Sequence, residues 1–133
     1  SAISSVVSNI RPEIVYTVFR DDAHSDHEVV FDAVASATKT FRHPYVKRTL
    51  AYETLSETDF SLKPGQSAFR PNVFVNIEDY VEEKINLMKT FVSEIGEFPF
   101  PRSPKAIEAL ASLRGVQAGC LSAEAFMLLK EVD

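Results

Sequence analysis

The stretch DDAHSDHEVV, residues 21–30, combines residue types that bind metals and move protons. Its two histidines, His24 and His27, lie three positions apart among three aspartates. Neutral imidazole is a common metal ligand, and a carboxylate can accept its second ring N–H and so fix the tautomer. We therefore predict that the two rings share a polar pocket, in which Asp26 supports one of them.

The same stretch has an ordinary structural interpretation. Ser25 and Glu28 are spaced as S-x-x-E, the capping box that begins many helices, and a polar loop before a helix needs no catalytic role. Zinc normally takes at least three protein ligands, yet the third histidine, His43, follows the predicted helix. A helix of about 14 residues spans about 20 Å, so any metal site must draw on carboxylates or on residues absent from this chain.

Buried strands and amphipathic helices alternate around this stretch. Residues 13–19, EIVYTVF, are almost continuously apolar and predict a strand buried on both faces, as in a parallel sheet. A helix over residues 26–41 follows, and then strands over 48–54 and 72–77, separated by a turn-rich surface loop over 56–71. This rhythm is typical of a doubly wound α/β fold, in which ligands bind beyond the carboxyl ends of the strands.

The rest of the chain continues the same alternation. The remaining predicted elements are helices over residues 3–10 and 77–95, a helix between Pro104 and Gly115, and a closing strand over 123–132. Asn76 is expected to cap the second of these helices. The chain has neither a G-x-G-x-x-G motif nor a P-loop, so a nucleotide cofactor is not supported.

Composition restricts the classes of protein and of partner. The 133 residues are 45% hydrophobic and 25% charged, which suits one globular domain. The net charge is −5, and the densest basic run, residues 42–48, holds only three Lys or Arg, so nucleic-acid binding is not expected. A single cysteine, Cys120, fits a reducing compartment. No apolar run approaches the roughly 20 residues of a membrane span, and no secretory signal is recognised. We expect a cytoplasmic protein, and homo-oligomerisation remains open.

Three segments, in order along nearly all 133 residues, resemble one family. RPEIVYTVFRDDAHSDHEVVFDAV is similar to the P-D-x-V-(F/Y)…D-x-H-x-D-H segment of the PIG-L/LmbE-like N-acetylglucosamine deacetylases. FRPNVFVNI resembles their F-x-P-N-x-F-V-D-I strand, and RSPKAIEALASLRGVQAGCLSAEAFMLL resembles their A-x-x-R-G-x-x-x-G…A-E-A-F ending. The resemblance implies a Rossmann-like, three-layer α/β fold with a mostly parallel sheet.

The resemblance also implies an activity and assigns roles. Such enzymes are zinc-dependent hydrolases that remove an acetyl or other acyl group from an amino-sugar conjugate. In the family pattern, His27 is a zinc ligand, His24 stabilises the oxyanion or acts as an acid, and Asp26 orients a histidine. No substrate-binding residue is identified.

One departure from the family is large. Its A-H-P-D-D-E motif, which supplies a histidine and an aspartate to zinc and a second aspartate as general base, is missing. Residues 1–133 are therefore expected to be the C-terminal portion of a single domain whose sheet is incomplete here, and to be inactive alone. Two alternatives stay open: a catalytically inactive member that serves as a sugar-binding or interaction domain, and an unrelated small α/β binding module with a chance H-x-D-H.

Overall fold

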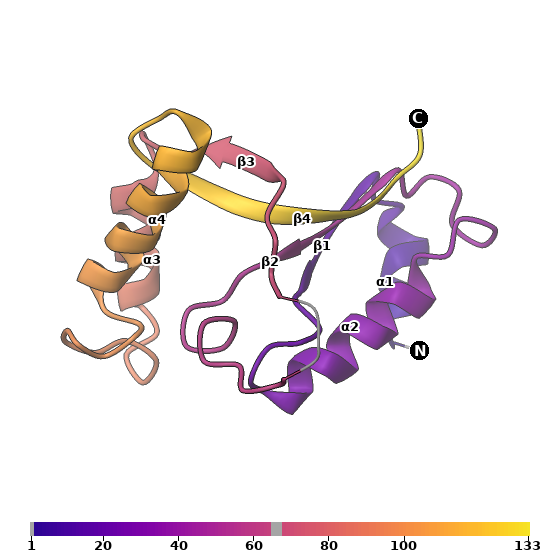
Figure 1. Cartoon of the computed structure of the whole chain (residues 1–133). Helices are drawn as coiled ribbons and strands as arrows, with labels where there is room; N and C mark the ends of the chain where they lie inside the picture. The colour runs from indigo at the N-terminus through magenta and orange to yellow at the C-terminus, as the bar shows by residue number, and fades with distance from the viewer. Residues whose placement is uncertain (1, 65–67) are drawn as a thin grey trace. The chain divides into compact units, whose positions relative to one another are not determined.

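The computed structural model describes residues 2–64 and 68–133 (Figure 1). In chain order its elements are α1 (Ala2–Ile10), β1 (Ile14–Val18), α2 (Ser25–Ala37), β2 (Arg48–Tyr52), β3 (Val73–Asn76), α3 (Val81–Lys89), α4 (Pro104–Ala118) and β4 (Ala123–Glu131). The α/β class predicted from the sequence is confirmed. The predicted loop over 56–71 contains neither helix nor strand in its described part, and residues 65–67 lie outside the described residues.

The sheet is mixed rather than mostly parallel. Its strand order is β1-β2-β4-β3. Strands β1 and β2 are parallel, in a register that runs from Ile14 opposite Arg48 to Val18 opposite Tyr52. Strand β4 runs antiparallel to β2, with an irregularity between Thr49 and Leu50. The prediction of a mostly parallel sheet is therefore only partly right.

The chain divides into two compact units, residues 1–72 with 126–133, and residues 73–125. In the first unit, helices α1 and α2 pack together on one face of the β1–β2 pair (Figure 1). Val7 and Ala37, one from each helix, form a buried cluster with Val46, against which Val15 of β1 packs. This packing holds the carboxyl end of β1 and the start of α2 in a fixed relation.

Strand β1 differs from its prediction in burial. Its apolar sequence predicts cover on both faces, but Ile14 and Tyr16 are 42% and 52% exposed. Thr17 and Val18 are buried, so cover is complete only toward the carboxyl end. The physical reason is position, because β1 is the terminal strand in the order of the sheet.

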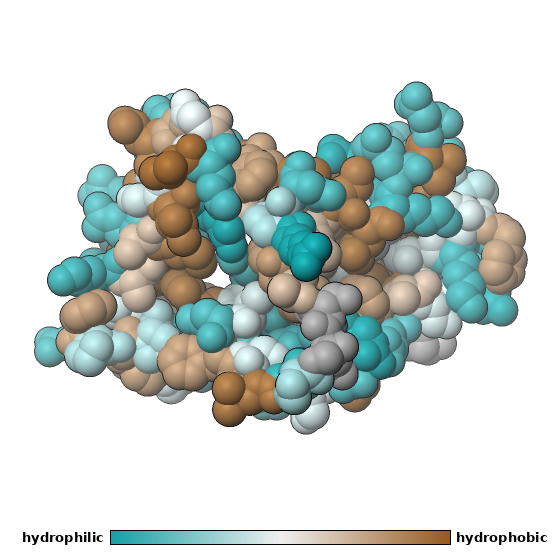
Figure 2. Space-filling view, in the orientation of Figure 1, coloured by the Kyte–Doolittle hydropathy of each residue, from teal (hydrophilic) through white to brown (hydrophobic). Residues whose placement is uncertain are grey.

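The second unit contains β3, α3 and α4. The long helix predicted over 77–95 is shorter, because Asn76 Oδ1 accepts the N–H of Glu78 and starts a turn rather than a helix. Helix α4 begins as predicted, with the Ser103 side chain accepting the Ala106 N–H, but it continues past Gly115 to a left-handed C-cap at Gly119. In Figure 2 apolar surface lies over these two helices.

Candidate functional site

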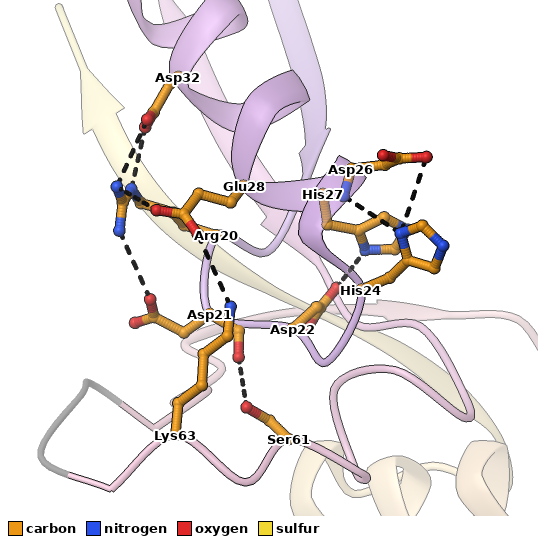
Figure 3. Close-up of polar contacts among 10 residues, drawn as sticks. All are labelled: Arg20, Asp21, Asp22, His24, Asp26, His27, Glu28, Asp32, Ser61 and Lys63. Carbon is orange, nitrogen blue, oxygen red and sulfur yellow. Dashed lines mark hydrogen bonds and ion pairs between the residues drawn. The ribbon is translucent and has the colours of Figure 1, made fainter.

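The predicted site lies in the turn between β1 and α2, where the two histidines enter the first turn of the helix (Figure 3). His24 is the N-cap, and its Nδ1 accepts the Asp26 backbone N–H at 3.1 Å. The capping box predicted from Ser25 and Glu28 is therefore wrong. Ser25 is already helical, and Glu28 bonds Arg20 instead.

A buried carboxylate holds His27. The Asp22 side chain is 0% exposed, and its Oδ2 lies 2.6 Å from His27 Nδ1. A carboxylate only accepts hydrogen bonds, so Nδ1 carries the proton that the ring donates to Asp22. The neutral His27 ring is then unprotonated at Nε2, and this lone pair is free to bind a metal. Because 21% of the side chain is exposed, the ring is reachable from solvent.

Asp22 is fixed from its other side by a loop that follows β2. Thr58 Oγ1 donates to Asp22 Oδ1 at 2.6 Å and accepts the Thr54 backbone N–H at 2.9 Å. The loop is also joined to the site by an Ala23 N–H bond to the carbonyl of Glu57, at 2.9 Å. Both oxygens of the buried carboxylate thus have partners, which a buried charge requires.

The two histidines are held in opposite tautomers. Because His24 Nδ1 accepts a backbone N–H, the neutral ring carries its proton on Nε2 and donates there. His27 is the reverse, a donor at Nδ1 and an acceptor at Nε2. Their ring centroids are 6.2 Å apart. The pair therefore offers one hydrogen-bond donor and one metal-binding lone pair within a single small region.

Asp26, expected to orient a histidine, lies at the exposed side of the pair. Its side chain is 81% exposed, and its Oδ2 lies 3.7 Å from His24 Nδ1, beyond hydrogen-bond length. It contributes to His24 through its backbone N–H instead. The carboxylate that bonds a histidine is that of Asp22, which points toward His27 in Figure 3. The only signal for Asp22 in the sequence is its place directly after a buried strand.

Arg20 connects the end of β1 to helix α2. It donates to Glu28 Oε1 at 2.8 Å and to Asp32 Oδ1 at 2.9 Å, with Asp21 at 3.8 Å (Figure 3). The hydrogen bond to Asp32, together with its charge, raises the pKa of Arg20 above its ordinary value. These pairs are exposed and contribute little stability, but they set the direction in which α2 leaves the loop.

Two further groups complete the surroundings of the site. Burial, and secondly the charge of Asp22, raise the pKa of Tyr52 above its ordinary value, so its hydroxyl stays protonated at neutral pH. His43 is buried elsewhere, with Nδ1 2.6 Å from the hydroxyl of Tyr45, which donates to the carbonyl of Val7. His43 therefore has a structural partner and does not join the pair.

The described residues do not by themselves form a complete metal cage. Among residues 2–64 and 68–133, no three His, Cys, Asp or Glu side chains converge in a way that would hold an ion. The fit to zinc is thus that of one well-prepared ligand, His27, with the second-sphere carboxylate that zinc-bound histidines usually have. No helix within these residues is long and apolar enough to cross a membrane.

Comparison with known proteins supports the fold. No protein-family model and no curated protein matches this chain. The crystal structure of the conserved protein TT1542 from Thermus thermophilus is similar over 99% of the chain, with a TM-score of 0.72 and 20% identity. The chain spans 58% of the length of that protein. At this identity the likeness establishes a shared fold and nothing about activity.

Proposed function

We propose that this chain is the C-terminal portion of a zinc-dependent hydrolase that removes an acetyl or other acyl group from an amino-sugar conjugate. The observation that carries the proposal is the pair of opposite tautomers, with His27 unprotonated at Nε2 and His24 protonated there. Amide hydrolysis by a metal needs one group of each kind, a ligand and a donor to the developing oxyanion. The resemblance to PIG-L/LmbE-like deacetylases supplies the substrate class.

His27 would bind the metal through Nε2. Asp22 fixes the orientation of the ring and increases its basicity, since the short Nδ1–Oδ2 hydrogen bond places a buried negative charge behind it. A bound zinc ion would polarise the scissile carbonyl and lower the pKa of a coordinated water. Thr58 keeps the carboxylate aimed at the ring.

His24 would stabilise the oxyanion. Its Nε2–H is free to donate because the helix N–H of Asp26 occupies the other nitrogen. This bond also fixes the rotation of the ring at the N-cap, so the donor is in place before substrate arrives. The nearby Asp26 carboxylate, 3.7 Å from His24 Nδ1, would favour a protonated ring if His24 acts as an acid.

The remaining zinc ligands and the general base would come from a polypeptide segment outside these 133 residues. Zinc sites use at least three protein ligands, and His27 is the one that the described residues position for this role. The chain alone is therefore expected to bind zinc weakly and to have no deacetylase activity. We place the protein in the cytoplasm, where its one cysteine, Cys120, stays reduced.

The test uses the natural, full-length protein and two variants. Metal analysis should find one zinc per molecule, lost in His27→Ala and retained in His24→Ala. Amine release from N-acetylglucosamine conjugates should fall in His24→Ala by about 10²–10³-fold, as expected for removal of an oxyanion donor. Zinc in both variants at the wild-type level would overturn the assignment of His27.

One observation favours a second function, that of a catalytically inactive sugar-binding or interaction domain. In the family pattern Asp26 orients a histidine, but here its carboxylate is 81% exposed and lies 3.7 Å from His24 Nδ1, beyond hydrogen-bond length. A site that no longer needs this contact is compatible with lost catalysis. If the full-length protein contains no zinc and releases no amine, this second function replaces the first.

A further inference from the structure

The outer edge of strand β1 exposes backbone that a sheet would normally pair. Among residues 2–64 and 68–133, β1 has β2 as a neighbour on one side and stands at the end of the strand order. Its side chains Ile14 and Tyr16 are 42% and 52% exposed, although the strand is built from the β-branched and aromatic residues of a buried one. Soluble proteins normally protect such an edge with charges, prolines or bulges.

The direction of each backbone group can be assigned. The carbonyl of Glu13 accepts the N–H groups of Lys47 and Arg48, at 2.7 and 3.0 Å, so the backbone of Glu13 faces β2. Backbone groups alternate in direction along a strand. Ile14, Tyr16 and Val18 therefore direct their N–H and C=O groups to the outer edge. None of these three residues lies in a turn, so an added strand would meet a continuous ladder.

We propose that an additional β-strand, from a segment outside these 133 residues, pairs in parallel with the outer edge of β1. Only an extended backbone satisfies a row of alternating donors and acceptors. The likeness to TT1542 shows that a protein of this fold has chain to supply it, because the matched part is 58% of that protein and the other 42% (100 − 58) lies outside the match. The β-rich, nearly uncharged sequence of β1 is typical of a strand inside a parallel sheet.

A second copy of this chain fits the edge less well. Two β1 edges related by a two-fold axis would run antiparallel, which places the two His27 loops at opposite ends of the pair. A parallel strand instead ends beside the loop that follows β1. If the proposed hydrolase function is right, the residues after that strand reach His27 Nε2, so the same segment provides the missing ligands. This last step rests on the proposed function, whereas strand pairing does not.

The experiment is amide hydrogen exchange at single-residue resolution. It compares the 133-residue chain with the protein purified from its native cells, including any stoichiometric partner. In the chain alone, Tyr16 and Val18 should exchange quickly and Thr17, which faces β2, slowly. In the native protein, Tyr16 and Val18 should exchange at least about tenfold more slowly. His27→Ala should leave this protection unchanged, which separates strand pairing from metal binding.

Two variants test the same edge in the native protein. Tyr16→Pro removes one outward N–H and should abolish the added protection at Val18, while the Leu50 amide, in the interior of the sheet, stays slow and reports an intact fold. Leu62→Pro, at a loop residue that is 92% exposed, is the matched control and should change neither. Fast exchange of Tyr16 and Val18 in the native protein would overturn the proposal. So would protection that depends on the concentration of the isolated chain, since the occupant would then be a second copy.

Discussion

The replacement Asp22→Asn should invert the tautomer of His27. In the wild-type chain Asp22 Oδ2 accepts from His27 Nδ1 at 2.6 Å, and Oδ1 accepts from Thr58 at 2.6 Å. Asparagine keeps one acceptor oxygen, which the Thr58 hydroxyl needs, and presents an NH₂ group to the histidine. His27 Nδ1 must then accept, and the ring proton moves to Nε2, where it blocks metal binding.

The size of the effect follows from the hydrogen bond that is exchanged. A hydrogen bond to a charged group is worth about 1.5–3 kcal/mol, and every 1.4 kcal/mol is about tenfold in an equilibrium. The wild-type chain should therefore favour the Nδ1–H form of His27 by roughly 10- to 140-fold. Loss of this orientation should weaken zinc binding in the full-length protein by about 10–100-fold.

The assay is a long-range ¹H–¹⁵N correlation spectrum of the imidazole nitrogens. It is recorded at about pH 8.5, where imidazole is mostly neutral. Asp26→Asn is the matched control, because it makes the same chemical change on a carboxylate that is 81% exposed and lies beside the other histidine. An Nε2–H tautomer of His27 in the wild-type chain, or an unchanged tautomer in Asp22→Asn, would refute the reasoning.

Three further predictions concern stability. Because the folded-state pKa of Tyr52 is raised by burial and by Asp22, the stability it contributes is present below about pH 10 and is lost as the pH rises through the folded-state pKa; Tyr52→Phe should reduce this alkaline loss in urea titrations, and equal losses in both proteins would count against it. Gly115→Ala places a Cβ 2.6 Å from the carbonyl oxygen of Cys120 and should cost about 1–3 kcal/mol, seen as a lower melting temperature. Ser103→Ala removes a fully buried helix cap and should cost about 1 kcal/mol in the same measurement, so an unchanged midpoint would contradict the capping role.

Local patterns in the sequence predicted most of the elements and the location of the candidate site. The apolar run at 13–19 and the polar run after it place His24 and His27 at the start of a helix, because both signals lie within a few adjacent residues. The supporting carboxylate was harder to assign. Asp26 is adjacent to both histidines in sequence, but the first turn of α2 directs its side chain to solvent and leaves Asp22 beneath His27.

Features that depend on distant parts of the chain were not predictable. Thr58 reaches Asp22 from 36 positions away, and no local pattern links the two. Gly115 was expected to end its helix, yet it lies inside α4 because the backbone of Cys120 and Leu121 passes too close for any side chain. Strand β1 was expected to be covered on both faces, since its sequence indicates that it suits burial but not which neighbour provides it.

The hydrogen bonds that run from the Thr54 backbone through Thr58 and Asp22 to His27 join a loop after β2 to an imidazole that precedes it by more than a strand. His27 therefore acquires its final orientation only once the later loop has folded against the earlier one. Substitutions or insertions in residues 54–58 could adjust how strongly His27 donates electrons without touching any ligand. In an engineered or divergent relative, this loop is where metal preference could change while the H-x-D-H sequence stays the same.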